Sequence, residues 1–136
     1  MPENIVVFGR SLGAAAAIDL ATKRKLKSVI IESGFLSTRH MAGRMGVFSL
    51  LSPFLPAHYN NLEKISMISV PVLIIHGVKD ETVPFSMGEK LYEAANEPKF
   101  FYRIEGSGHN DTYLVGGAEY LEIFNNFVRD SKIGAD

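Results

Sequence analysis

The sequence contains no cysteine among its 136 residues. A disulfide framework, a thiolate nucleophile and a cysteine-based zinc site are therefore excluded. Any catalytic chemistry must come from hydroxyl, carboxylate and imidazole groups. The spacing of the histidines, such as His40 to His58, matches no metal-binding motif, and no glycine-rich phosphate loop is present. We therefore expect neither a metal nor an organic cofactor.

Long apolar runs and a strong charge bias are also missing. The apolar run at 5–8 is too short to span a membrane, and the N-terminus lacks the basic region and long apolar core of a signal peptide. The net charge is −1, and lysine and arginine are dispersed apart from a short cluster at 23–27. Nothing in this pattern indicates a nucleic-acid partner. The sequence predicts a cytoplasmic protein without a membrane span.

With 46% hydrophobic and 21% charged residues, the chain is expected to fold as one domain over 1–136. Short runs rich in β-branched residues alternate with helical stretches. We expect strands at 5–8, 28–31, 70–75 and 100–104, and helices at about 12–24, 86–96 and 117–130. The first three strands are continuous apolar runs, which are typical of a parallel sheet buried on both faces. The pattern predicts an α/β fold with functional groups at the C-terminal ends of the strands.

An insert at about 34–68 interrupts this alternation and has no clean period. Two interpretations are open: short helices that form a partial lid over the strand ends, or a packed connection that covers the edge of the sheet. Its apolar residues lie around two prolines, Pro53 and Pro56, and are Met41, Met45, Val47, Phe48, Leu50, Leu51, Phe54 and Leu55.

A candidate nucleophile, Ser11, lies in Gly9-Arg10-Ser11-Leu12-Gly13 between an expected strand and an expected helix. In a G-x-S-x-G turn the serine adopts a strained backbone conformation, and its flanking positions must be small. The turn also aims the N–H of Leu12 and the helix N-terminus at one point, where an oxyanion could be stabilised. The alternative is a serine that merely caps the helix.

The candidate acid is Asp80, in the loop that follows the buried strand ending at Ile75. A carboxylate at this place can orient an imidazole without taking up a proton itself. The alternative is an ordinary turn or capping aspartate. Glu32, at the end of the second expected strand, is the second candidate for the acid.

The candidate base is His109, in a glycine-containing loop beyond the last expected strand. A neutral imidazole there can take the proton of Ser11 and return it to a leaving group. The other histidines fit this role less well: His76 ends a strand but precedes the acid, which favours a packed residue, and His40 and His58 lie in the insert. Asp111 is expected to cap the last helix or to support the His109 loop.

Five segments together resemble the serine hydrolases of the α/β-hydrolase superfamily. They are Gly9-Arg10-Ser11-Leu12-Gly13, Ile31-Glu32-Ser33, Val70-Pro71-Val72-Leu73-Ile74-Ile75-His76-Gly77, Asp80-x-x-Val83-Pro84 and Gly106-x-Gly108-His109-Asn110-Asp111. The Arg before the serine and the His-Asn-Asp run are similar to the branch with fungal and animal membrane-associated hydrolases and protein depalmitoylases. The resemblance implies Ser11 as nucleophile, Asp80 as acid, His109 as base and the Leu12 N–H as an oxyanion donor.

The same resemblance implies the C-terminal half of an α/β-hydrolase fold, with about four parallel strands and flanking helices. Family members have roughly half their length before the serine turn, including the loop that gives a second oxyanion N–H, whereas four residues precede the first expected strand here. The strand at 5–8 would then lie at an exposed edge, which can pair with another chain. We expect a homo-oligomer, or pairing with a complementing N-terminal half.

These features predict a serine hydrolase of small-molecule ester or thioester bonds that works through an acyl-enzyme. The alternative is a non-catalytic, truncated hydrolase half that acts as an interaction or self-associating module.

Overall fold

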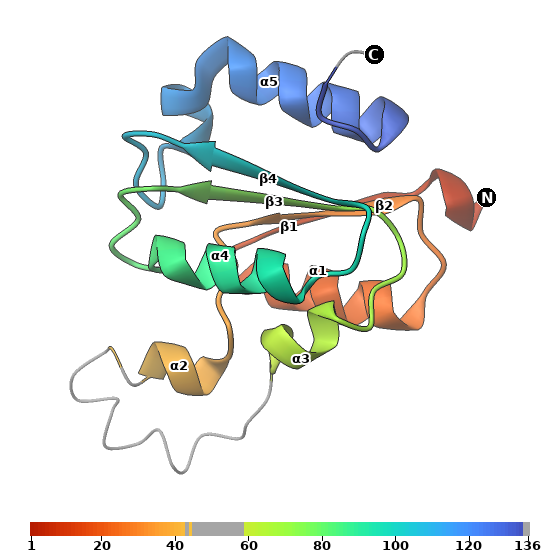
Figure 1. Cartoon of the computed structure of the whole chain (residues 1–136), viewed down its shortest axis with the longest axis horizontal. Helices are drawn as coiled ribbons and strands as arrows, with labels where there is room; N and C mark the ends of the chain where they lie inside the picture. Colours follow the sequence, from red (N-terminus) through yellow and green to blue (C-terminus); the bar gives the residue numbers. More distant parts are fainter. Residues whose placement is uncertain (43, 45–58, 135–136) are drawn as a thin grey trace.

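The computed structural model describes residues 1–42, 44 and 59–134. Its centre is a sheet of four parallel strands in the order β1-β2-β3-β4. The strands are β1 (Val6–Arg10), β2 (Ser28–Glu32), β3 (Val72–Gly77) and β4 (Lys99–Ile104). The predicted α/β fold with four parallel strands is confirmed, and all four strands end at the same side of the molecule (Figure 1).

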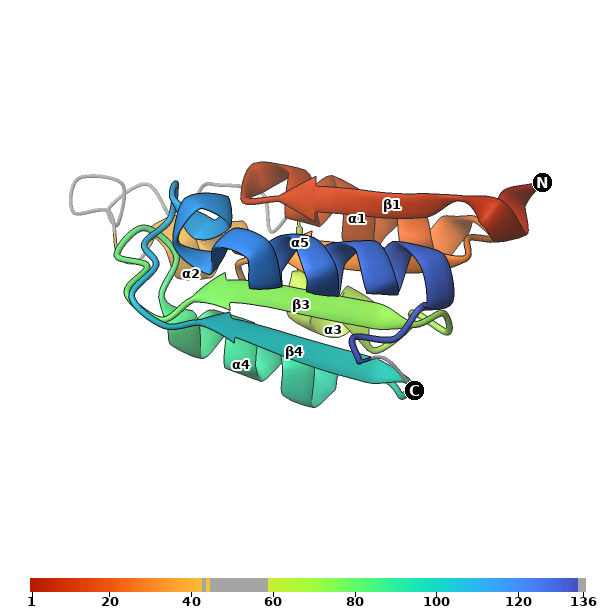
Figure 2. The same ribbon diagram turned by 90° about the horizontal axis from the view of Figure 1, so that it is seen from above.

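Helices cover both faces of this sheet. On one face lie α1 (Leu12–Lys23), α3 (Asn61–Ile65) and α4 (Phe85–Ala94), and on the other lies α5 (Thr112–Asp130), as Figures 1 and 2 show. Side chains of β3 alternate between the two resulting cores: Val72 and Ile74 contact the α1 side, whereas Leu73 and Ile75 contact the α5 side. This double burial explains why the central strands are continuous apolar runs.

The two edges of the sheet differ from its centre. Every residue of β2 and β3 is buried, but β1 has no strand on its outer side among the described residues. Phe8 of β1 is 46% exposed, although its ring packs edge-to-face against Phe124 of α5. The strand before the serine turn therefore lies at an exposed edge of the described sheet, as expected.

The observed bounds depart from the expected ones mainly at α5. This helix begins at Thr112, five residues before the expected start at Gly117. Gly117 has φ 55° and ψ −133°, so it kinks the helix and separates a first short turn from the rest. A conformation with positive φ suits glycine, which has no Cβ. The strand β1 also extends to Arg10, beyond the expected end at Phe8.

Two short helices lie in the expected insert. They are α2 (Thr38–Ala42) and α3, and a 3-10 helix, η1 (Pro2–Asn4), precedes β1. The predictions that concern 43 and 45–58, including His58 and the lid interpretation, lie outside the described residues. His40 is exposed on α2, and its Nδ1 is 2.7 Å from the Ser37 hydroxyl. None of the described helices has both the length and the apolar character needed to cross a membrane.

Candidate active site

Ser11 lies at the sharp turn between β1 and α1, as expected for the candidate nucleophile. Its backbone has φ 52° and ψ −117°, a conformation that is strained for a residue with a Cβ. The turn is fixed by two hydrogen bonds, from the Ser11 N–H to the Glu32 carbonyl at 2.9 Å and from the Ala14 N–H to the Ser11 carbonyl at 3.0 Å. Leu12 is the first residue of α1, so its N–H belongs to the turn that lacks intrahelical acceptors.

The glycines of the turn carry unequal constraints. A Cβ built on Gly9 would lie 2.3 Å from the Gly13 carbonyl oxygen and 2.6 Å from the Ala17 Cβ, which no real side chain tolerates. A Cβ on Gly13 would meet no atom within 4 Å in the described structure. In the described structure, the expectation that both positions must be small therefore holds for Gly9, which lies against the Gly13 carbonyl and the Ala17 side chain, and does not hold for Gly13.

Asp80 lies in the loop between β3 and α4, and its carboxylate is fully buried. Oδ1 accepts hydrogen bonds from the N–H groups of Thr82 at 2.9 Å and Val83 at 2.8 Å. Oδ2 is 2.8 Å from Nδ1 of His109. With one oxygen fixed by backbone donors, the other is held toward the imidazole.

His109 lies between the other two predicted residues. Its Nε2 is 3.0 Å from Oγ of Ser11, and its Nδ1 contacts Asp80. An ionised carboxylate can only accept hydrogen bonds, so Nδ1 carries the ring proton. Nε2 of the neutral ring is then free to accept a hydrogen bond from the Ser11 hydroxyl. The structure thus brings Ser11, His109 and Asp80 into one chain of hydrogen bonds from loops that follow β1, β4 and β3.

The His109 loop is held to the Asp80 loop. The Lys79 N–H donates to the Ser107 carbonyl at 2.9 Å, and Asp111 Oδ1 accepts from the Gly108 N–H at 2.8 Å and from the Ser107 hydroxyl at 3.1 Å. A Cβ on Gly77 would lie 2.5 Å from the Ser107 carbonyl oxygen, so this close approach requires glycine. Of the two roles expected for the Asp111 side chain, the support of the loop is observed, whereas α5 has no side-chain capping bond.

His76 is fully buried in β3, in agreement with the expectation of a packed residue. Its Nε2 is 2.8 Å from the Val83 carbonyl and 3.5 Å from Asp80 Oδ2. Burial lowers the pKa of His76, and the Val83 carbonyl and the Asp80 charge offset part of this effect. A neutral ring therefore donates from Nε2, and its Nδ1 has no hydrogen-bond partner among the described residues.

Glu32, the second candidate for the acid, bonds to Arg10 and Tyr120 rather than to His109. Its buried carboxylate is 3.0 Å from Nε of Arg10 and accepts from the Tyr120 hydroxyl at 2.8 Å. Burial, followed by the hydrogen bond to Glu32, raises the pKa of Tyr120. These contacts were not predicted from the sequence, although a cation and an anion near the ends of two successive expected strands were a usable signal.

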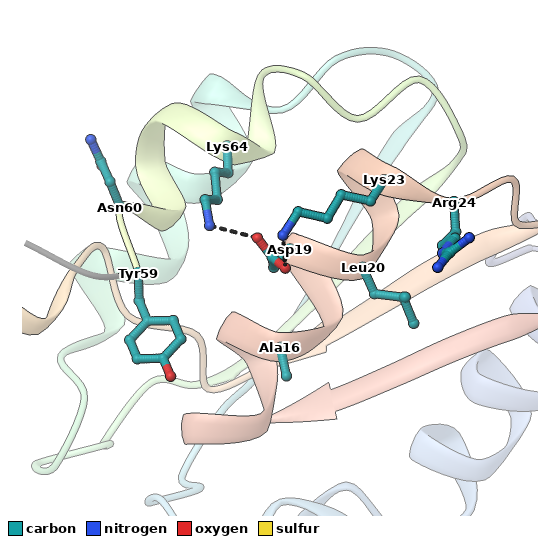
Figure 3. A pocket seen from close by; sticks show the side chains of 8 residues that line it. All are labelled: Ala16, Asp19, Leu20, Lys23, Arg24, Tyr59, Asn60 and Lys64. Atoms are coloured by element: carbon teal, nitrogen blue, oxygen red, sulfur yellow. Dashed lines mark hydrogen bonds and ion pairs between the residues drawn. The ribbon is translucent and has the colours of Figure 1, made fainter.

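A hollow of about 1120 Å³ lies away from these loops, between α1 and the segment before α3 (Figure 3). The Asp19 carboxylate in it is 2.7 Å from both Lys23 and Lys64, and these hydrogen bonds lower its pKa. Among the described residues that line the hollow, none is a serine or threonine beside a histidine. Within the described part of the chain, no group of three or more His, Asp or Glu side chains could hold a metal ion.

A parallel sheet with a serine at the turn after a strand, hydrogen-bonded to a loop histidine and a loop acid, is characteristic of the α/β-hydrolases. Residues 6–109 match the family model "Serine hydrolase (FSH1)". This chain therefore belongs to the FSH1 serine hydrolase family, and the resemblance found in its motifs is confirmed.

Curated relatives support the same assignment. The chain is 37% identical over 127 residues to the alpha/beta hydrolase domain-containing protein 17B of Homo sapiens. The aligned region covers 93% of this chain and 42% of that protein. It is 35% identical over 132 residues to an uncharacterized protein of Mycobacterium tuberculosis strain H37Rv, with 97% of this chain and 47% of that protein covered. The chain thus spans slightly less than half the length of these relatives.

Solved structures share the fold at low sequence identity. The acylaminoacyl peptidase of Pyrococcus horikoshii superposes with a TM-score of 0.79 at 15% identity, covering all of this chain and 25% of that one. The esterase domain of a Rhodothermus marinus protein gives a TM-score of 0.67 at 20% identity, covering 95% of this chain and 61% of that one. At these identities the likeness concerns the fold alone.

Proposed function

We propose that this chain carries a Ser-His-Asp hydrolase site that cleaves ester or thioester bonds of small molecules. The observation that carries the proposal is the continuous set of hydrogen bonds from the Ser11 hydroxyl through His109 to Asp80, at 3.0 and 2.8 Å. Family membership supports a hydrolase over the alternative of a non-catalytic interaction module.

The proposed reaction begins when Ser11 Oγ attacks the substrate carbonyl while Nε2 of His109 takes the hydroxyl proton. Asp80 holds the Nδ1–H of His109 and stabilises the imidazolium that forms. The N–H of Leu12 donates to the developing oxyanion. Removal of one such donor lowers the rate of catalysis by ~10²–10³-fold. The protonated His109 then gives its proton to the leaving alcohol or thiol. Water, activated by the same imidazole, hydrolyses the acyl-Ser11 ester.

Labelling with a fluorophosphonate probe tests this proposal. We expect the probe to phosphonylate Ser11, seen as a mass increase on the peptide that contains it, and to leave Ser11→Ala unlabelled. The control is Ser69→Ala, which removes an exposed serine just before β3 and should label like the parent. Well-folded parent protein that resists the probe would contradict the proposal for this chain. Hydrolysis of matched oxygen and thiol esters then distinguishes the two substrate classes.

The edge of the sheet suggests how this chain associates. We propose that the outer side of β1 pairs with a strand of another polypeptide, either a second copy of this chain or a complementing N-terminal half. Two features support this pairing. Ile5 and Phe8 at this edge are apolar and partly exposed. An unpaired strand also presents free N–H and C=O groups to another chain.

We also propose that residues 1–136 form one partial domain with the insert at 34–68, and that the protein acts in the cytoplasm. The absence of cysteine supports this location, because a protein without disulfides suits a reducing compartment. Limited proteolysis that cuts only within 34–68 would support the domain proposal. Fractionation of cells that express the protein tests its location.

A further inference from the structure

Arg10 is bonded at two places that lie far apart in the chain. Its Nε forms an ion pair with Oε2 of Glu32 at 3.0 Å. Its Nη2 donates to the backbone carbonyl of His109 and, at 2.9 Å, to Oδ1 of Asn110. The guanidinium therefore joins the end of β2 to the loop that carries the candidate base.

The position of Arg10 follows from the register of the sheet. Arg10 ends β1 and lies opposite Glu32, which ends β2. Residues opposite each other on neighbouring strands share a face of the sheet, and here that face is the one covered by α5, from which Tyr120 reaches Glu32 at 2.8 Å. Three elements thus meet in the Arg10–Glu32–Tyr120 network directly beside Ser11.

The network is firmly anchored at its inner end. The Glu32 side chain is 2% exposed and has both oxygens occupied, one by Arg10 and one by Tyr120. The guanidinium is planar and presents its donors in a fixed fork, so a pair held at Nε also fixes the direction of Nη2. A lysine could pair with Glu32 but could not hold both partners in this geometry.

The His109 loop needs such an anchor on this side. Gly106 and Gly108 precede the histidine, and the Asp111 carboxylate holds the loop only at Ser107 and Gly108. Arg10 holds the next two residues, His109 and Asn110. The backbone of His109 is therefore fixed between two side chains of opposite charge, and its ring is fixed by Asp80.

We infer that Arg10 is a positioning residue for the proposed hydrolase site: the Arg10–Glu32–Tyr120 network holds the His109 backbone so that Nε2 stays within hydrogen-bonding distance of Ser11 Oγ. The inference rests on the proposed function for its effect on reactivity, and on the contacts alone for its effect on the loop. Arg10 itself acts through His109 and takes no proton.

The test compares fluorophosphonate labelling rates of the parent, Arg10→Gln, Arg10→Lys and the double variant Arg10→Gln/Glu32→Gln. The single glutamine variant leaves the buried Glu32 without its cation and is expected to be less stable. The double variant removes both charges, so we expect it to keep the fold. Misplacement of a catalytic group by about 1 Å costs on the order of 10²-fold, so we expect both glutamine variants to label about 10–100-fold more slowly. Arg10→Lys should recover thermal stability but not the parental rate.

Arg129→Gln is the matched control. In the described structure the side chain of this arginine bonds to Asn126 and Asp130, and it lies at the end of α5 remote from Thr112. It should label like the parent. A folded double variant, or Arg10→Lys, that labels at the parental rate would overturn the inference. Hydrogen exchange of residues 105–111 provides a second measurement that needs no activity.

This second measurement separates failure of the inference from failure of the proposed function. Faster exchange of 105–111 in the double variant than in Arg129→Gln is expected even if the parent does not react with the probe. A parent that is not labelled would contradict the proposed function, whereas unchanged exchange in the double variant would overturn the positioning role of Arg10.

Discussion

At the scale of single residues, the candidate acid is set by its surroundings more than by its place in the sequence. Glu32 ends a buried strand and Asp80 follows one, and both side chains are buried carboxylates. Asp80 has one oxygen free of backbone donors and directed at His109, whereas both oxygens of Glu32 are bonded by Arg10 and Tyr120. Chemically similar side chains thus have different proposed roles, one toward the base and one toward its supporting loop.

His76 makes the stability of the protein depend on pH. Its pKa is lowered from 6.5 in the folded state, chiefly by burial, while the unfolded chain binds the proton at the ordinary value. As pH falls below 6.5, the unfolded state takes up a proton that the folded state refuses, so stability is lost until the lower folded pKa is reached. Asp80, His109 and Glu32 are the ionisable groups whose charges would act on the pKa of His76.

We therefore expect His76→Gln, which retains a donor toward the Val83 carbonyl, to lose part of this pH dependence. Urea unfolding at several pH values between about 7 and 5 measures it, and the slope lost for one group is at most about 1.4 kcal/mol per pH unit. His40→Gln, which changes an exposed histidine of α2, is the control. Identical pH dependence in His76→Gln and the parent would rule out this role of His76.

At the scale of elements, the junction of β1 and α1 determines where Ser11 lies. The strand can enter the turn only because Gly9 lets the backbone pass the Gly13 carbonyl and the Ala17 side chain. The helix that follows is rich in alanine and lies closely against the sheet, with Ala14, Ala15 and Ala17 buried. The strained conformation of Ser11 is thus supported by packing on both sides.

The two glycines of this junction predict opposite effects on stability. Gly9→Ala places a methyl group 2.3 Å from a backbone oxygen, and overpacking of this kind costs about 1–3 kcal/mol. Gly13→Ala enters open space in a helix and should stabilise the protein by up to about 1 kcal/mol. Urea midpoints of the two variants measure the difference. Equal midpoints would show that the close approach at Gly9 does not constrain the turn.

Several elements could be predicted from the sequence because each produces a local signal. The apolar runs of β2 and β3 and the glycine-flanked serine are such signals, and they lead to the correct strands and to the loops that carry the candidate residues. The start of α5 could not be predicted, because Gly117 resembles a helix boundary but is a kink inside the helix. The bond between Tyr120 and Glu32 joins residues 88 positions apart, and no local pattern encodes it.

At the scale of the whole molecule, the sheet is asymmetric. One edge, β4, is followed by the loop of the candidate base, and the other, β1, is followed by the candidate nucleophile and is unpaired on its outer side in the described structure. The proposed association therefore takes place beside the site, and a strand added to β1 would lie next to the turn that holds Ser11.

We expect the parent to form a dimer or larger assembly in light-scattering measurements. Ile5→Lys should shift it toward the monomer, because a lysine at a sheet edge opposes pairing with a second strand. Leu121→Lys places the same charge on an exposed position of α5, 59% accessible, and should leave the assembly unchanged. A monomeric parent would contradict self-association through β1 and would leave pairing with a different N-terminal half as the proposal.

The bond between His109 and Ser11 connects residues 98 positions apart, and the segment between them contains the strands β2, β3 and β4. Contacts of such long range form late in folding, because the entropy of closing a long loop must be overcome first. Neither half of the sheet can assemble this contact by itself, since Ser11 follows β1 and His109 follows β4. The reactivity proposed for Ser11 would therefore report the completion of folding, and it would fall as soon as either edge strand detached.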